Sequence, residues 1–123
     1  MISKEEFEQL TGEAYDHLQE KYKSRINNLV ILVEDFPSKE QMKKVGVSSE
    51  YGLLGLYEGR IQSRRINVGV VLPDKITLFY IPIAKSCSDI KICKQRIENT
   101  LRHEIAHHFG SDEEGARKAS NIR

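Results

Sequence analysis

The chain has 123 residues, of which 39% are apolar and 30% charged, and its 19 basic and 18 acidic side chains leave a formal net charge of +1. This composition excludes a disordered chain, the length predicts a single domain over residues 1–123, and the charge balance argues against a nucleic-acid partner. No apolar run approaches the roughly 20 residues of a membrane span. The N-terminus lacks the apolar segment of a secretory signal, so we expect a cytoplasmic protein with no membrane partner.

Capping patterns predict where helices begin. In four places a Ser is followed three residues later by an acid or amide, which satisfies unbonded amides of a helix's first turn: Ser3 with Glu6, Ser38 with Gln41, Ser86 with Asp89, and Ser111 with Glu114. The first predicted helix repeats apolar residues at helical spacing over Phe7–Tyr22 and is expected to reach about Arg25. The second is short, over Lys39–Val45, and Gly46 suits the left-handed residue that ends it.

Strand candidates lie between the helices, at Leu29–Phe36, Gly52–Tyr57, Ile66–Leu72 and Ile76–Ile83. The continuous apolar run of the first predicts a strand covered on both faces, and a short turn around Pro73 is expected to join the last two. These elements predict an α+β fold, in which a small mixed β-sheet packs against an N-terminal helix and a C-terminal helix.

The two cysteines, Cys87 and Cys93, are six residues apart in what is predicted to be one helix. Zinc clusters favour Cys pairs two to four residues apart, and the chain has no second pair, so we do not expect these residues to bind metal. Cys93 falls on an apolar helix face, and we expect it to be a buried, unreactive free thiol.

The segment Leu101–Gly110 contains the pattern His-Glu-x-x-His, formed by His103, Glu104 and His107, in a predicted helix that starts near Cys87. Side chains four residues apart on a helix face the same way, so the two imidazoles can converge on one metal ion, of which zinc is the usual one. The Glu beside the first His can take a proton from a bound water. In a chain of this composition the pattern is expected on the order of 0.01 times by chance, which argues against an accidental match.

Helical phase separates the histidines of this segment from one another. At about 100° per residue, one apolar stripe is formed by Ile90, Cys93, Ile97, Leu101 and Ile105. His103 and His107 fall on the opposite face, and this placement favours ligands over core residues. His108 falls on the stripe, so we expect it to be a packed, hydrogen-bonded residue and not a ligand.

A catalytic zinc site uses three protein ligands, and the third is expected just after Gly110, where a left-handed turn can bring the chain back toward the metal. Ser111 is expected to cap a following helix whose first turn contains Asp112, Glu113 and Glu114. Capping explains Glu114, so Asp112 or Glu113 is the predicted third ligand, although these acids also suit the positive end of a helix dipole.

The segment His103–Gly110, followed by Asp112 and Glu113, resembles the motif His-Glu-x-x-His-x-x-Gly-x-x-Asp or His of the minimal zincin-like metallopeptidase family. The resemblance extends upstream to Leu53–Gly59 and Leu72–Tyr80. The chain departs from the motif at its last ligand, because Glu113 takes that position and the Asp comes one residue early.

This resemblance implies a reduced zincin fold with a small sheet and an active-site helix. It implies Zn²⁺ as cofactor, with His103 and His107 as ligands and Glu104 as the general base.

Two functions remain in view. The first is a zinc-dependent metallopeptidase that hydrolyses a peptide bond in a peptide or protein substrate. In it, Ile76–Tyr80 is expected to be a strand lining the cleft, to which an extended peptide would add as another strand. The second is a catalytically weak or inactive zinc-binding or protein-interaction domain of the same fold, because a chain of 123 residues has little material for substrate pockets. A closed site filled by both Asp112 and Glu113 would favour the second function, and an open position for water would favour the first.

Overall fold

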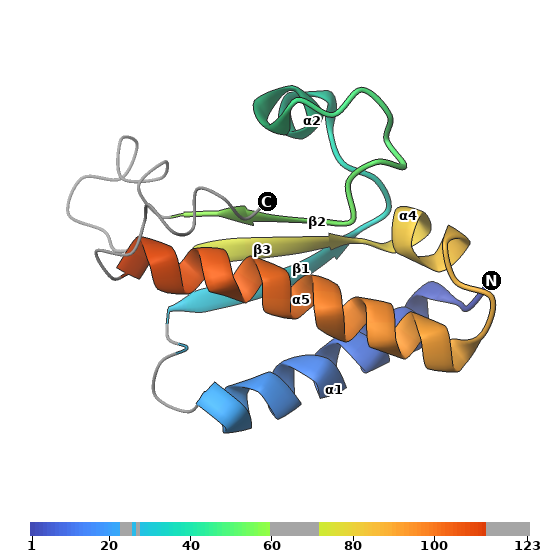
Figure 1. The fold of residues 1–123 in the computed structure, drawn as a ribbon, viewed down its shortest axis with the longest axis horizontal. Helices are drawn as coiled ribbons and strands as arrows, with labels where there is room; N and C mark the ends of the chain where they lie inside the picture. The colour runs from blue at the N-terminus through green and yellow to red at the C-terminus, as the bar shows by residue number, and fades with distance from the viewer. Residues whose placement is uncertain (23–25, 27, 60–71, 113–123) are drawn as a thin grey trace.

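The protein is a small α+β fold, as predicted (Figure 1). The structure is a computed structural model that describes residues 1–22, 26, 28–59 and 72–112, of which residues 111 and 112 are described by their backbone only. Its elements in chain order are α1 (Lys4–Tyr22), β1 (Leu29–Glu34), α2 (Lys39–Val45), β2 (Gly55–Glu58), β3 (Asp74–Phe79), α4 (Tyr80–Lys85) and α5 (Ile90–Asp112). Within the described residues, no helix is long and apolar enough to cross a membrane.

The described strands form one mixed sheet in the order β1-β3-β2. β3 lies in the centre, where it pairs in parallel with β1 and antiparallel with β2. β1 is therefore an edge strand of the described sheet, and the expectation that it is covered on both faces is wrong: Leu32 is 40% exposed. The expectation that Ile76–Tyr80 lines a cleft as a pairing edge is also wrong, because both edges of β3 are already occupied.

The longest helices, α1 and α5, lie side by side, and α5 runs along β3 and β2 (Figure 1). Their contact with the sheet forms the core, in which the largest fully buried apolar side chains are Phe7, Leu18, Ile76, Leu78, Ile83, Ile97, Leu101 and Ile105. The short helix α2 lies on the other side of the molecule from α1 (Figure 1). The core thus fixes α5, the helix with the His-Glu-x-x-His pattern, against two strands of the sheet.

The first two predicted caps are confirmed. The amide of Glu6 donates to Ser3 Oγ at 3.1 Å, and the amide of Gln41 donates to Ser38 Oγ at 3.0 Å, with both partners returning a side-chain oxygen to the Ser amide. Gly46 ends α2 with φ of 76°, in the left-handed region, as predicted. The expected extension of the first helix to Arg25 lies outside the described residues. Of the strand predicted over residues 66–72, only Leu72 is among the described residues. The strand expected to lead into the turn around Pro73 therefore also lies outside them, apart from Leu72.

The strand predicted over Ile76–Ile83 is too long, because β3 ends at Phe79 and α4 begins at Tyr80. Pro82 gives the physical reason: it has no N–H for a β-ladder but fits the first turn of a helix. The helix α4 ends at Lys85 with Ser86 as its C-terminal cap, so the third predicted cap, at a helix start, is wrong as well. Asp89 begins α5 instead, since its Oδ1 accepts a hydrogen bond from the amide of Ile92 at 2.9 Å.

Cys87 and Cys93 form a disulfide, so the expectation of a free thiol at Cys93 is wrong, although Cys93 is buried as expected. On one continuous helix, residues six apart would point in different directions and could not be bridged. The break between α4 and α5 instead brings the two Cα atoms to 5.4 Å, a distance that suits a disulfide.

Candidate metal centre

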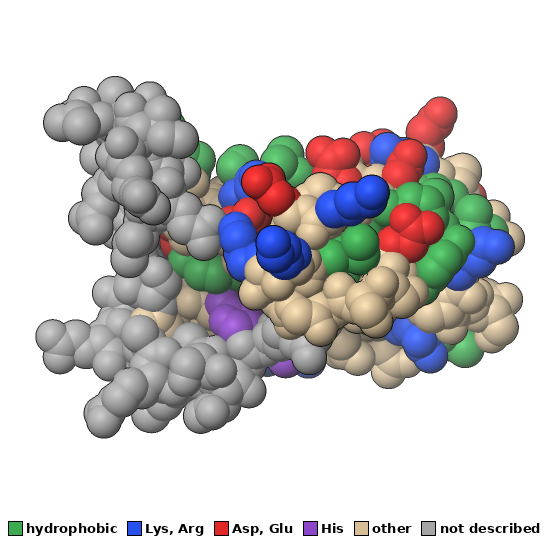
Figure 2. Space-filling model, turned by 90° about the horizontal axis from the view of Figure 1, so that it is seen from above, with side chains coloured by type: hydrophobic (Ala, Val, Ile, Leu, Met, Phe, Trp, Pro, Cys, Tyr) green, Lys and Arg blue, Asp and Glu red, His purple; other side chains and the backbone are tan. Residues whose placement is uncertain are grey.

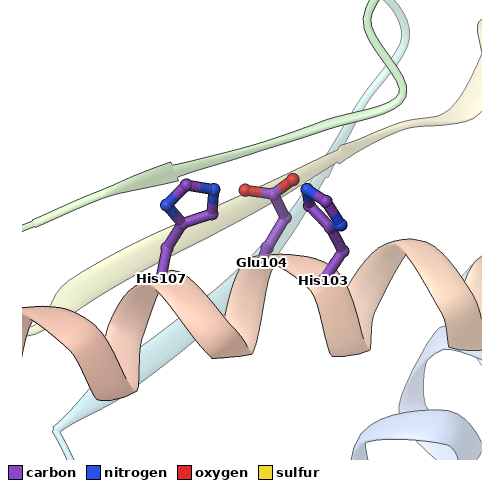
Figure 3. Close-up of side chains that lie close together, drawn as sticks. All are labelled: His103, Glu104 and His107. Carbon is purple, nitrogen blue, oxygen red and sulfur yellow. The ribbon is translucent and has the colours of Figure 1, made fainter. Parts of the chain in front are cut away.

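Three side chains of α5, those of His103, Glu104 and His107, converge on the side of the helix that faces β2 (Figure 3). Each offers one ligand atom, and these atoms all lie within 4.8 Å of one another. The convergence follows from the helical spacing, which places residues three and four apart on one side of α5. The structure therefore brings together the two predicted histidine ligands and the predicted base.

The buried face of α5 confirms the predicted helical phase. Cys93, Ile97, Leu101 and Ile105 are at most 2% exposed, whereas His103 is exposed. Ile90 is an exception at 50% exposure, because it is the first residue of α5 and adjoins an exposed loop. His103 thus lies away from the core and reaches solvent, whereas His107 is half-buried and its Nε2 is buried.

Glu104 is the buried member of the group, with an exposed fraction of 3%. Burial raises the pKa of its carboxyl group to about 8, although a hydrogen bond from the backbone of Tyr57 on β2 opposes this shift. Its Oε1 is buried and has no hydrogen-bond partner among the residues that the structure describes. A cation or a water molecule beside the two imidazoles would satisfy this atom, so the donor set fits a divalent metal such as zinc.

A cleft of about 350 Å³ adjoins the group. One wall is the segment Gly52–Gly55, which leads into β2, and the other is α5 from Asn99 and Thr100 to His103 and Glu104. On the face shown in Figure 2, histidine side chains reach the surface, and acidic and basic side chains are interspersed. The cleft therefore gives a ligand access to the metal group from a surface without one dominant charge.

Behind the group, His108 is buried as predicted, at 1% exposure, and its Nδ1 lies 2.7 Å from Oδ2 of Asp74. The same oxygen of Asp74 accepts a hydrogen bond from the Tyr57 hydroxyl, also at 2.7 Å. The ring of Tyr57 in turn stacks on the ring of His107, with centroids 6.0 Å apart and planes at 8°. Tyr57 of β2 and Asp74 of β3 thus both contact the turn of α5 that carries His107 and His108.

The sequence profile of the zincin-like metallopeptidase family matches residues 26–120, which is most of the chain. The chain belongs to this family. The match includes all the described strands and α5 but leaves out α1. A search of curated proteins found no match. Membership implies a metal ion, usually zinc, and the group of His103, Glu104 and His107 can hold one.

The family motif places a last ligand after Gly110, and here one sequence expectation is wrong. The chain does not leave the helix at Gly110, because α5 continues to Asp112, and the only left-handed glycine among the described residues is Gly46. Ser111 is therefore inside α5 and does not cap a new helix. Glycine in a helix costs only about 1 kcal/mol relative to Ala, which the tertiary contacts of α5 can override. The side chain of Asp112 and the whole of Glu113 lie outside the described residues, so the choice of third ligand stays a prediction.

Two residues of this site, Tyr57 and Asp74, were not singled out from the sequence. The signal that was available is positional, because both occur in the two upstream segments that resemble the family. An Asp directly after Pro73 fits an ordinary turn, and only the structure shows that Asp74 is 1% exposed and accepts two hydrogen bonds.

Proposed function

We propose that this protein is a zinc-dependent peptidase in which His103 and His107 bind the metal ion and Glu104 is the general base. The observation that carries the proposal is the buried Oε1 of Glu104, which is held between two imidazoles with no hydrogen-bond partner in the described part of the chain. A purely structural Glu would have both carboxyl oxygens hydrogen-bonded or exposed, because a buried oxygen without a partner destabilises the fold. Its position beside two metal-ligand candidates supports a chemical role.

A bound zinc ion supplies Lewis acidity, which lowers the pKa of water and polarises a carbonyl group. Glu104 accepts a proton at Oε1 and later returns it to the leaving amine. The Tyr57 backbone amide holds the carboxyl group in place while this proton moves. The deep position of Glu104 keeps bulk water from competing for the proton.

The substrate proposed for this site is a peptide or an unfolded protein segment that enters the cleft between Gly52–Gly55 and α5. The walls near the site are backbone, the side chains of Leu53 and Leu54, and the uncharged polar side chains of Asn99 and Thr100. Such walls accept a neutral segment of chain better than a strongly charged one. A cleft of about 350 Å³ suits a short stretch of chain on either side of the cleaved bond.

The test combines metal analysis with hydrolysis of a quenched fluorescent peptide library. We expect about one zinc per purified chain, strong loss of zinc in His103→Ala, and no loss in the matched control His17→Ala, which removes an exposed His on α1. Glu104→Gln is expected to retain zinc and lose hydrolysis by roughly 10²–10⁴-fold, the usual contribution of a general base.

Each negative result has a separate meaning. Wild-type protein without stoichiometric zinc at neutral pH would refute the metal site. Full hydrolysis by Glu104→Gln would refute the assigned base. Zinc without any hydrolysis in the wild type would favour the metal-binding or interaction domain.

A further inference from the structure

Asp74, the first residue of β3, contacts both β2 and α5, the helix that carries His103, Glu104 and His107. Its side chain is almost completely buried, and its Oδ2 accepts hydrogen bonds from the Tyr57 hydroxyl and the His108 ring, each at 2.7 Å. Burying a carboxyl group is costly unless it is hydrogen-bonded, so these two contacts explain how Asp74 is tolerated in the core. Through them, one residue of β2 and one residue of α5 bind the same oxygen atom.

Tyr57 connects Asp74 to the group of His103, Glu104 and His107. Its ring is nearly parallel to the ring of His107, at 8°, while its hydroxyl is held by Asp74. Because the Tyr57 hydroxyl is bonded to Asp74, the phenol ring restricts rotation of the His107 imidazole from one side. The backbone of Tyr57 also bonds to Glu104, so one residue of β2 touches two members of the group.

His108 connects Asp74 to the turn of α5 that carries His107. It follows His107 directly, and its bond to Asp74 crosses from α5 to β3. Rotation of this turn of the helix would break that bond between two buried side chains, which costs roughly 1–3 kcal/mol. These contacts therefore restrain the backbone that carries His107 as well as its ring.

From these contacts we infer that Asp74, acting through Tyr57 and His108, is a positioning residue for the metal ligand His107. The inference rests on the proposed metal site. Asp74 itself does not touch the metal group, and its effect is to hold one imidazole in a fixed orientation before a metal ion arrives. Partners that orient ligands in this way are typically worth about 10–100-fold in metal affinity.

The test measures Zn²⁺ affinity by competition with a chromophoric chelator in wild type, Tyr57→Phe and Tyr57→Leu. Phe keeps the ring on His107 but loses the bond to Asp74, whereas Leu loses both. We expect affinity to fall by about tenfold in Tyr57→Phe and further in Tyr57→Leu. The matched control is Tyr51→Phe, which removes a hydroxyl from an exposed Tyr on the neighbouring segment and is expected to leave affinity unchanged.

Two further measurements distinguish positioning from simple support of the fold. The absorption spectrum of bound Co²⁺ reports ligand geometry, and it is expected to change in Tyr57→Phe and in Asp74→Asn but not in Tyr51→Phe. Urea unfolding of the metal-free variants gives their stability separately. A structural role alone would lower the unfolding midpoint and leave both the Zn²⁺ affinity and the Co²⁺ spectrum of the folded protein as in wild type.

Unchanged affinity and spectrum in Tyr57→Phe would overturn the inference while leaving the proposed function intact. Failure of the wild type to bind Zn²⁺ or Co²⁺ would instead overturn the proposed function. Tyr57→Phe carries the decision if Tyr57→Leu or Asp74→Asn does not fold, because it keeps the ring and removes only one oxygen atom.

Discussion

A methyl group on Gly55 would lie 2.8 Å from Cγ2 of Thr100, a distance at which one of the two must move. The same methyl group would lie 3.2 Å from Leu78 Cδ2 and 3.4 Å from Cγ of Glu104. β2 and α5 therefore approach as closely as they do because residue 55 has no side chain. This approach occurs at the wall of the cleft and beside the buried carboxyl group.

Gly55→Ala is expected to destabilise the protein by about 1–3 kcal/mol, the usual cost of overpacking. Adding Thr100→Ser removes the clashing methyl group and should restore most of the loss, since Leu78 has a flexible end. Urea unfolding of the single and double variants measures both effects. Gly12→Ala is the control, because position 12 lies in α1 with nothing within 4 Å, and Ala there should stabilise by up to about 1 kcal/mol.

The metal-free protein should lose stability as the pH rises through the range in which Glu104 titrates. The pKa of Glu104 is raised from 4.5 to about 8 in the folded protein by burial, so the folded state holds a proton that the unfolded state releases. The free energy of unfolding should therefore fall by about 1.4 kcal/mol per pH unit between these values, apart from other groups. Gln at position 104 cannot titrate. The free energy of unfolding of Glu104→Gln, relative to that of wild type, is therefore expected to rise from a small difference at pH 5 to a large one at pH 8.

This comparison is made by urea unfolding in the presence of a chelator. A difference between Glu104→Gln and wild type that does not depend on pH would contradict the assignment of a protonated, buried Glu104. Glu50→Gln, at an exposed site, controls for the loss of one acid elsewhere on the surface.

Zinc itself should stabilise the fold, because both histidines converge only in the folded helix. At a free Zn²⁺ concentration 100 times the dissociation constant, the gain is about 2.7 kcal/mol. Thermal unfolding with added zinc and then with excess EDTA measures this gain. We expect His107→Ala to lose nearly all of the zinc-dependent shift, and an equal shift in that variant would contradict the ligand assignment.

Glu58 on β2 forms ion pairs with Lys44 of α2 at 3.0 Å and with Lys75 of the neighbouring strand β3 at 3.5 Å. Burial raises the pKa of Glu58, but hydrogen bonds from Lys44 and Gln41 and the charge of Lys75 outweigh it and leave the pKa below 4.5. A depressed pKa gives stability that is complete above pH 4.5 and is lost as the pH falls through the lower, folded value. We expect Glu58→Gln to cost about 1 kcal/mol or less at pH 7, since the lysines are partly exposed.

The measurement is the difference in unfolding free energy between wild type and Glu58→Gln from pH 7 to pH 2.5. The difference should narrow only in the acidic part of this range. If the difference in unfolding free energy is the same at pH 2.5 as at pH 7, the ion pairs of Glu58 do not stabilise the fold.

The features that could be predicted from sequence are those set by neighbours in the chain. The bounds of α2 follow from Ser38 and Gly46, whose effects extend three or four residues, and the burial of His108 follows from its phase on α5. Spacing alone was also enough to place His103 beside His107.

The features that could not be predicted depend on distant contacts. The hydrogen bonds that bury Asp74 join it to residues 17 and 34 positions away, and no local pattern encodes such partners. The early end of β3 had a local signal in Pro82, but the apolar run around it favoured a strand. Helix α5 passes through Gly110 because its packing against the sheet outweighs the local preference of glycine to end a helix.

The central strand has a consequence for how the protein folds. Leu29 pairs with Asp74, and the whole β1–β3 register joins residues 45 positions apart, so the sheet forms only after a long loop has closed. Both histidines, in contrast, lie within one turn of a single helix and can meet while the rest of the chain is still open. We therefore expect the Tyr57 backbone donor to Glu104, and the Tyr57 ring beside His107, to reach the helix only in the slow step. Because the two histidines can bind zinc before this step, zinc is expected to accelerate folding more than it slows unfolding.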